Sequence, residues 1–453
     1  MGNSAMSASE GSAITSLLTR ADVALYALLA AAVVIGGGGV GYGYFNLIVQ
    51  LAALVVLALH RKEVVSFLKD GPRGLVLLVI ATLVLPLLQL VPLPPGMWSL
   101  LPGRDLVGQS LELVGATDDW MQVSVDPNRT ALGFIALLPA FAVLALGWSL
   151  GRSQARLALQ ILVGLALFGL ALGALQLASA NLVGNWYPGG HPQHLYGTFA
   201  NHNSTGIFLV IAMLALAGLP PNQAKRKRSV FQPLWTSLFA ALAVGVILTQ
   251  SRSSAALLVV PAVFLVVRSR FGGSQDQDRP GKPGLMIILP LALLFAGGGY
   301  LLLANEKVQQ TFERFDELEN RRPEIWQDSL VAIDRFWPIG SGVGTFDEVY
   351  QVDESLEHVA QTRAGRAHND YLELAIESGI AGVALLLAWL AWLGLAAWQA
   401  KSRSDPLTRL AAAAGLGCVV LQSVLDYPLR NEALLCVAAM LVALLARNRA
   451  KAE

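Results

Sequence analysis

The sequence predicts an all-α, polytopic integral membrane protein with about 12 transmembrane helices and a long extracytoplasmic loop that contains short helices. Of its 453 residues, 55% are hydrophobic and 14% are charged, whereas a soluble protein carries roughly 25% charged residues. The mean hydropathy of +0.56 agrees with this class. The apolar residues occur in blocks of about 15 to 23, the length that a helix needs to cross a ~30 Å hydrocarbon layer. This composition excludes a disordered chain, a secreted disulfide scaffold and a nucleic-acid binder.

The apolar blocks locate the predicted spans, although their ends are less well fixed than their positions. In order, the spans cover residues 21–43, 44–59, 74–91, 130–149, 157–178, 203–219, 232–249, 254–267, 285–303, 379–398, 410–426 and 432–446. Cys418 and Cys436 both lie inside such blocks, so neither a disulfide nor a cysteine-based metal site is expected.

The distribution of basic residues predicts the orientation of the spans, because short loops rich in Lys and Arg stay in the cytoplasm. Of the 32 Lys and Arg residues, 21 fall on the side that carries both termini and 11 on the opposite side. The predicted organisation is a cytoplasmic tail (1–20), spans one to nine (21–303) with outward loops near 92–129 and 179–202, a long outward loop (304–371), spans ten to twelve (372–446) and a second cytoplasmic tail (447–453).

The long outward loop, residues 304–371, is where a catalytic or recognition element is expected, because loops held on a rigid scaffold commonly carry such elements. It contains seven Lys and Arg and fourteen Asp and Glu residues, a net charge of −7. Any anion site in this loop must therefore be local, since the overall field of the loop repels anions.

Two motifs have a simpler explanation than the sites they resemble. Gly340, Gly342 and Gly344 could hold a phosphate with backbone amides, but they do not follow a strand of a βαβ unit, so a glycine turn after a helix is favoured. Asp276 and Asp278 form an Asp-x-Asp pattern that can bind a divalent metal. They lie in a hydrophilic stretch rich in Gly and Pro on the predicted cytoplasmic side, where a solvated linker is favoured.

Arg252 is a candidate site residue because it lies in a very short outward turn, residues 249–254, between two apolar blocks. A charged side chain in such a place costs free energy unless a partner satisfies it. Long basic side chains also extend to the membrane interface without any function. Position alone leaves both interpretations open.

Residues 320–326, Asn-Arg-Arg-Pro-Glu-Ile-Trp, predict the start of a helix because proline is favoured in the first turn. Trp326, Leu330, Ile333 and Trp337 then recur at spacings of 4, 3 and 4. This spacing predicts one apolar face, which lies on the membrane surface or packs over the spans.

Either position holds Arg322 near the lipid headgroups, where a guanidinium group can bind diphosphate oxygens through bidentate hydrogen bonds. The alternative is a solvated pair, Arg321 and Arg322, among the neighbouring acidic residues Glu317, Glu319 and Glu324.

His368 is the strongest single candidate, because it lies where the long loop returns to span ten. Residues 379–398 suffice to cross the hydrocarbon layer, so residues 369–378 are expected to form a polar extension of that helix outside the membrane. A histidine at this place can accept a proton from a hydroxyl group at neutral pH, as a general base does.

Asn369 and three acidic residues follow His368 in the sequence. Asp370, Glu373 and Glu377 lie at spacings of 3 and 4 on one helical face, where they favour a helix N-terminus and could orient the imidazole or raise its basicity. The alternative is a histidine that only caps the helix, and the spacing does not separate the two.

His202, with Asn201 and Asn203, precedes span six, and His191 and His194 lie nearby. A zinc site is disfavoured here because no pair of ligands has the i, i+4 spacing of a helix and no carboxylate is close in the sequence. A polar loop that touches the substrate or caps span six is the favoured interpretation.

Together these segments resemble the O-antigen ligase and O-antigen polymerase family of bacterial integral-membrane glycosyltransferases. The resemblance covers residues 190–400, and the first five spans match only in being hydrophobic. Its motifs are, in order, Gly197-Thr198-Phe199-Ala200-Asn201-His202-Asn203; Ser251-Arg252; Arg322-Pro323-Glu324-Ile325-Trp326 leading to Pro338-Ile339-Gly340-Ser341-Gly342-Val343-Gly344; and His368-Asn369 followed by Gly379 and Gly382.

The resemblance implies a C-type glycosyltransferase-like fold and an inverting, metal-independent transfer without a cofactor at the periplasmic face of the bacterial inner membrane. The donor would be an undecaprenyl-diphosphate-linked glycan, and the acceptor a sugar hydroxyl of lipid A-core or of a second lipid-linked chain. Family roles carry over to Arg252 and Arg322 for the diphosphate and to His368 for activation of the acceptor. Arg322 is preferred to its rival Arg321 because it stands four residues before Trp326, as in the family pattern. The residues expected to support the site are Asn201, His202, Asn203, Asn369, Asp370 and Glu373.

The residues themselves fit this chemistry. Displacement of a diphosphate develops negative charge that fixed guanidinium groups stabilise, and the acceptor hydroxyl needs a base to take its proton. A ligase is favoured over a polymerase, which would use the same donor and a different acceptor. A lipid-glycan transporter is the alternative from another class, but no internal repeat is visible and the interiors of the spans are nearly free of charge.

Overall fold

The computed structural model describes residues 20–39, 42–187, 190–219, 225–271, 321–359 and 363–447. Over these residues the regular secondary structure is almost entirely helical, which confirms the predicted all-α class. The exception is an antiparallel pair of two-residue strands, β1 (Pro92–Leu93) and β2 (Met121–Gln122). The ninth predicted span, 285–303, and the Asp276–Asp278 motif lie outside the described residues.

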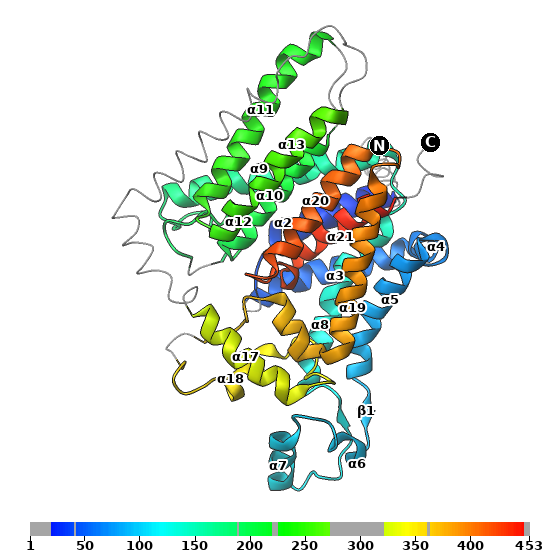
Figure 1. The fold of residues 1–453 in the computed structure, drawn as a ribbon, viewed down its shortest axis with the longest axis vertical. Coiled ribbons are helices and arrows are strands. Elements are labelled where there is room, and N and C mark those ends of the chain that lie inside the picture. Colours follow the sequence, from blue (N-terminus) through cyan, green and yellow to red (C-terminus); the bar gives the residue numbers. More distant parts are fainter. Residues whose placement is uncertain are drawn as a thin grey trace, which may run out of the picture.

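Most of the described helices form one bundle, and the remaining elements lie in its connections (Figure 1). The bundle helices are α2 (Ala21–Ile35), α3 (Gly43–Leu59), α4 (Arg61–Asp70), α5 (Arg73–Gln89), α8 (Pro127–Gly147), α9 (Arg152–Ala178), α10 (His202–Gly218), α11 (Lys225–Leu248), α12 (Arg252–Leu257), α13 (Val259–Phe271), α19 (Asp370–Ala400), α20 (Pro406–Gln422) and α21 (Glu432–Ala446). The remaining elements are α6 (Pro95–Trp98), α7 (Asp105–Val114), α17 (Arg322–Phe336), α18 (Phe346–Asp353) and the 3₁₀ helix η2 (Pro428–Arg430).

Within the described residues, three helices are long and apolar enough to cross a membrane, namely α8, α9 and α19. The pair α3 and α4 makes a fourth if the two form one span with a bend of 77°. Further apolar helices have 10 to 17 residues. These helices are typical of a multi-pass membrane protein, but the predicted number of twelve spans is not confirmed.

Local breaks shorten two of the predicted spans. The first, 21–43, ends at Ile35, because Gly36–Gly39 leave the helix. A Cβ atom at Gly37 would lie 2.1 Å from the carbonyl oxygen of Thr198, so only glycine allows this approach. The eighth span, 254–267, is divided at Leu258 into α12 and α13.

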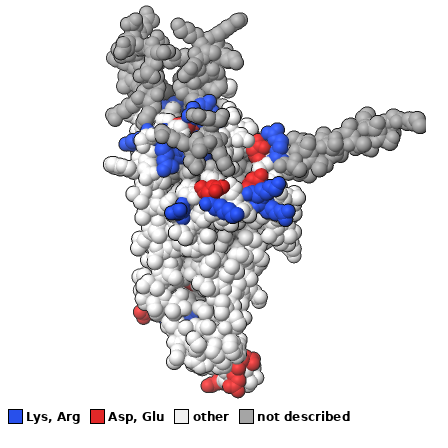
Figure 2. Space-filling view, turned by 90° about the vertical axis from the view of Figure 1, so that its right-hand side faces the viewer, with Lys and Arg blue, Asp and Glu red and all other residues white. Residues whose placement is uncertain are grey.

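The helices alternate between two ends of the bundle. At one end, which we call the basic end, Gln154 near the start of α9 donates to Asp22 at the start of α2, with an Nε2–Oδ2 distance of 3.0 Å. At the opposite end, which we call the site end, Asn431 before α21 donates to the carbonyl oxygen of Gly37 at 3.0 Å. Figure 2 shows Lys and Arg gathered towards one end of the face that carries α4, α5 and α19, beside a broad band without charges. Such an uncharged band is expected where lipid covers a protein.

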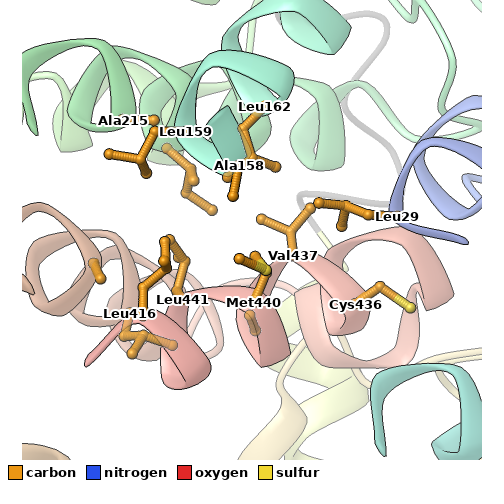
Figure 3. Packing of buried hydrophobic residues seen from close by; sticks show 14 of the residues in the cluster. Leu29, Ala158, Leu159, Leu162, Ala215, Leu416, Cys436, Val437, Met440 and Leu441 are labelled. Carbon is orange, nitrogen blue, oxygen red and sulfur yellow. The ribbon is translucent and has the colours of Figure 1, made fainter. Parts of the chain in front are cut away.

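Helix α10 lies at the centre of the bundle, since every residue from Asn203 to Gly218 is buried. A helix that is apolar on all sides is expected to be enclosed by other helices. Figure 3 shows the packing around it, where Leu162 of α9, Leu416 of α20 and Met440 of α21 point into one apolar cluster. The two cysteines are buried and free.

Helix α19 is broken at Gly379, so residues 370–378 are not the straight extension of span ten that the sequence predicts. Gly379 has φ 51° and ψ −142°, and the glycine-rich segment 338–344 fills the break. The N–H groups of Ser341 and Gly342 donate to the carbonyl oxygens of Ile376 and Glu377, each at 2.9 Å. Since these amides have protein partners, the segment is the predicted glycine turn and not a phosphate cradle.

Replacing Gly379 with alanine is expected to lower the free energy of unfolding by about 2 kcal/mol or more, because its backbone conformation is restricted to glycine. A Cβ atom at this position would also lie 2.1 Å from the carbonyl oxygen of Pro338. Thermal unfolding of the purified protein in detergent measures the effect. Gly394→Ala in the same helix is the control, because its Cβ meets no atom within 4 Å; equal stability of the two variants would contradict the prediction.

Candidate active site

His368 immediately precedes α19 and has a positive φ of 50°, which is uncommon for a residue with a side chain. Asn369, not His368, caps the helix, because its Oδ1 accepts hydrogen bonds from the N–H groups of Tyr371 and Leu372 at 2.9 and 3.1 Å. The interpretation of His368 as a helix cap is therefore wrong. Its side chain is 19% exposed, so the imidazole is largely enclosed and still accessible.

Asp426 and Tyr427, which follow α20, contact the imidazole of His368. The Nδ1 atom lies 3.4 Å from Oδ1 of Asp426, whose side chain is 4% exposed. The ring of Tyr427 meets the imidazole edge to face, with 5.1 Å between the ring centroids. Sequence reasoning missed both residues, since Asp426 is merely a charge at the edge of a predicted span. The carboxylate beside His368 therefore comes from a different helix from the one that the sequence suggests.

The acidic residues that follow His368 contact Arg430 of η2 instead of the imidazole. The Nε atom of Arg430 lies 3.7 Å from Asp370 and 3.4 Å from Glu373, and its Nη1 atom lies 2.7 Å from Glu377. The spacing of 3 and 4 residues does place the three carboxylates on one helical face, but that face is turned towards η2. Their ion-pair partners are Arg430 and Arg366 and not the imidazole, although Glu373 accepts a hydrogen bond at 2.9 Å from the N–H of Ala367, directly before His368.

Arg366 completes this buried group of charges. Its Nη1 atom donates to Glu373 at 3.0 Å, and its guanidinium carbon lies 6.0 Å from the ring centroid of Tyr427. Sequence reasoning missed Arg366 and Arg430. Arg430 could have been found by the argument used for Arg252, since it also lies in a short turn between two apolar blocks.

Asn201 reaches the same place from α10. Its Nδ2 atom donates to the hydroxyl oxygen of Tyr427 at 3.2 Å, while its Oδ1 atom accepts from the N–H of Asn203 at 2.8 Å and caps the helix. Burial raises the pKa of Tyr427 to about 12, so the hydroxyl keeps its proton at neutral pH. The structure thus confirms the predicted cap of span six, which is Asn201. Tyr427 contacts both this cap and the imidazole of His368.

His202, the first residue of α10, belongs to a cluster of three imidazole rings tilted against one another. Its Nδ1 atom lies 2.9 Å from the carbonyl oxygen of Thr249, and its ring centroid is 4.4 Å from that of His194, which in turn is 4.7 Å from His191. Burial, followed by the neighbouring His202 and His191, lowers the pKa of His194 to about 3. In the part of the chain that the structure describes, no group of three or more His, Cys, Asp or Glu could hold a metal ion.

Arg252 is the first residue of α12 and its side chain is exposed. Ser251 caps this helix by accepting a hydrogen bond from the N–H of Ser254 at 3.2 Å. The next residue, Ser253, accepts a hydrogen bond from Nε2 of Gln422 at 2.9 Å. Helix α12 is therefore joined to the end of α20, four residues before Asp426.

Arg321 and Arg322 have different surroundings. Arg321 lies 3.4 Å from the carboxylates of both Glu324 and Glu354, and it also donates to the backbone carbonyl of His358. Through these contacts Arg321 joins the start of α17 to residues 354–358. Arg322 begins α17 and is partly buried.

Helix α17 is attached to the segment that carries His368. The Nε1 atom of Trp326, one turn after Arg322, donates to the carbonyl oxygen of Ala367 at 2.8 Å. Because Ala367 directly precedes His368, this bond fixes the helix that carries Arg322 relative to the imidazole.

Only part of the predicted apolar face of α17 packs on the protein: Ile333 contacts the buried apolar cluster that includes Phe336, whereas the exposed part is in keeping with the expectation of a face on the membrane surface. Leu330 is 58% exposed and Trp337 is 42% exposed, whereas Ile325, Ala332 and Phe336 are buried. The apolar residues of α17 form two overlapping stripes, the predicted one and a second one made of Ile325, Ala332 and Phe336. The contacts of α17 with α18 and α19 bury the second stripe.

Some of the site residues are in direct contact, and the helices that carry the two arginines are linked to them. His368, Asp426, Tyr427 and Asn201 form a continuous set of contacts. The other two elements are joined to this set indirectly, α17 through the Trp326–Ala367 bond and α12 through the Ser253–Gln422 bond. The arrangement can present a base and, from two separate helices, guanidinium groups.

Residues 237–387 match a protein-family model that is described as O-Antigen ligase. The resemblance found in the sequence is therefore confirmed for an O-antigen ligase domain over this stretch. Arg252, Arg322 and His368 lie inside it, whereas Asn201 and Asp426 lie outside. No curated protein matches the sequence.

Proposed function

We propose, on the premise that residues 237–387 are an O-antigen ligase domain, that this protein is a glycosyltransferase of the ligase type. It moves a glycan from an undecaprenyl-diphosphate carrier to a sugar hydroxyl, such as one of lipid A-core, at the periplasmic face of the bacterial inner membrane. The observation that carries this proposal is the enclosed imidazole of His368 with Asp426 at its Nδ1 atom. The segment that carries His368 is hydrogen-bonded to the helix of Arg322, and α20, which precedes Asp426, is hydrogen-bonded to the helix of Arg252.

The His368 side chain supplies the base of the proposed reaction. The carboxylate of Asp426 lies 3.4 Å from Nδ1, within ion-pair distance but without a hydrogen bond. In the proposed reaction its charge favours a ring proton on Nδ1, and Nε2 accepts the proton of the acceptor hydroxyl. The negative charge of Asp426 then stabilises the imidazolium that forms. Since His368 has a fixed backbone and an enclosed ring, little reorientation is needed during the reaction.

The two arginines act on the leaving group. The acceptor oxygen forms a bond to the anomeric carbon as the bond from that carbon to the diphosphate oxygen breaks, and attack from the opposite face inverts the configuration. The electron pair and the negative charge pass to the diphosphate. Guanidinium groups of Arg252 and Arg322 stabilise this charge through bidentate hydrogen bonds, so the proposal includes no metal or cofactor.

The decisive experiment supplies the purified protein in detergent with one undecaprenyl-diphosphate-linked oligosaccharide and, separately, with lipid A-core or without it. A product on lipid A-core supports the ligase. Elongation of the lipid-linked chain alone indicates a polymerase. Because detergent removes both the gradient and the second compartment, absence of any joined product with active donor and acceptor would favour a transporter.

Replacing Arg252 or Arg322 with alanine is expected to lower kcat by about 10²-fold or more, because each removes a charged donor that acts in the transition state. Arg321→Ala is the matched control, since its guanidinium is held by Glu324 and Glu354. Arg321→Ala is expected to lower the melting temperature and to leave kcat nearly unchanged. If Arg321→Ala abolished transfer and Arg322→Ala did not, the assignment of the diphosphate contact would be reversed.

A further inference from the structure

Gln422, the last residue of α20, is 1% exposed and joins two parts of the site. Through its side chain, Nε2 donates to the hydroxyl oxygen of Ser253 at 2.9 Å, and Ser253 is the neighbour of Arg252. Through its backbone, the carbonyl oxygen of Gln422 accepts from the N–H of Asp426 at 2.8 Å. One residue therefore contacts both the helix that presents Arg252 and the turn that presents Asp426 to His368.

The hydroxyl of Ser253 is itself held in place. It lies 3.3 Å from the hydroxyl of Ser251, which caps α12 and also contacts the hydroxyl of Ser254 at 2.9 Å. Ser254 in turn is buried against α10, where its hydroxyl donates to the carbonyl oxygen of Asn203 at 3.4 Å. The first turn of α12 is thus fixed to α10 by this serine group and to α20 by Gln422.

The buried amide of Gln422 stabilises the fold less than an apolar side chain of similar volume would. Its Oε1 atom is buried and has no hydrogen-bond partner among the described residues, and a buried amide oxygen without a partner destabilises a fold. A methionine or leucine would fill the same volume without this cost. The amide does, however, fix the position of α12 relative to α20 through a directional bond, which an apolar side chain cannot do.

We propose that Gln422 is a positioning residue that sets the separation between the diphosphate-binding Arg252 and the base formed by His368 and Asp426. This inference rests on the proposed function. In an inverting displacement, the leaving oxygen and the attacking oxygen must be held in line, and an error of about 1 Å in their placement can cost 10²-fold in rate. Because Gln422 is buried, it acts through the groups it positions, so its effect is expected on kcat and not on donor affinity.

The test compares Gln422→Met and Ser253→Ala, which remove the same hydrogen bond from its two sides, and their double variant. Each single variant is expected to lower kcat about tenfold, with the KM for the lipid-linked donor changed less than twofold. The double variant is expected to be no slower than either single variant, because only one bond is lost. Ser253→Thr keeps the hydroxyl and is expected to restore most of the rate.

Gln154→Met is the matched control, since it removes a similar side-chain bond between α9 and α2 at the basic end. It is expected to leave kcat unchanged. If Gln422→Met does not fold, Ser253→Ala and Ser253→Thr decide the question from the other side of the bond.

Two results overturn the inference. One is wild-type kcat in Ser253→Ala and Gln422→Met while Arg252→Ala and His368→Ala are inactive; the proposed function would then stand without the positioning role. The other is additive losses in the double variant, which would mean that the two side chains act separately. Full activity of Arg252→Ala and His368→Ala would instead refute the proposed function itself.

Discussion

Replacing His368 with alanine is expected to lower kcat for glycan transfer by about 10²-fold or more, because the acceptor hydroxyl then has no base to take its proton. The loss should appear in kcat with any acceptor, since proton transfer is common to all of them. Initial rates with a defined lipid-linked donor measure it. His358→Gln is the control, because that histidine lies in the same loop but contacts Asp328 at 2.9 Å, away from His368.

Asp426 gives a second test of the same assignment. Asp426→Asn is expected to lower kcat by about tenfold to hundredfold, because the amide no longer holds the imidazole in position or stabilises its charged form. In the background of His368→Ala, the same change should add nothing, since Asp426 acts only through the imidazole. Independent, multiplying losses would show that Asp426 has a different role, and near-normal transfer by His368→Ala would rule out the histidine as base.

Replacing Arg430 with methionine is expected to destabilise the protein by about 3–5 kcal/mol, because it leaves buried carboxylates without their common partner. Asp370, Glu373 and Glu377 are all buried, and Arg430 is within 4 Å of each. Arg366 still contacts Glu373 at 3.0 Å, but no ion pair among the described residues replaces the partner of Glu377. Unfolding in detergent, followed by heat or denaturant, measures the change.

The matched control for Arg430 is Arg363→Met. Arg363 pairs with Asp347 at 2.6 Å, but its side chain is 54% exposed, so its loss should cost less than about 1 kcal/mol. Adding Glu377→Gln to Arg430→Met should recover part of the stability, because it removes one of the unpaired charges. If Arg430→Met and Arg363→Met were equally stable, the buried group of charges would contribute nothing to the fold.

The sequence predicts the positions of the helices well where hydrophobicity alone determines them. Span twelve, predicted at 432–446, coincides with α21, because Asn431 provides a cap and an apolar run follows. The break of α19 at Gly379 could not be predicted, since it depends on the chain at Pro338–Gly342 filling the gap from a distant part of the sequence. The same holds for the apolar face of α17, which tertiary contacts choose between two stripes of similar hydrophobicity.

The candidate site likewise contains residues that the sequence predicts and residues that only the tertiary contacts reveal. His368 could be found because a polar helix start at the edge of a span is unusual in a chain so apolar. Its partner Asp426 could not, because the two residues meet only when the start of α19 packs beside the end of α20. The three acidic residues were the nearest carboxylates in the sequence, yet the direction in which their helical face points is set by Arg430, which the chain reaches more than fifty residues later.

The complete enclosure of α10 has a consequence for how this protein can vary. Since each position from Asn203 to Gly218 touches a neighbouring helix, a change of side-chain volume anywhere along α10 must be compensated by a second change across the contact. Beyond its break, α19 has few buried residues and one exposed side that includes Leu387, Leu395 and Trp398, and on that side one apolar residue can replace another with only the surrounding lipid to adjust. Among related sequences, substitutions in α10 should therefore be accompanied by substitutions at the contacting positions of neighbouring helices. Substitutions on the exposed side of α19 should occur independently of one another.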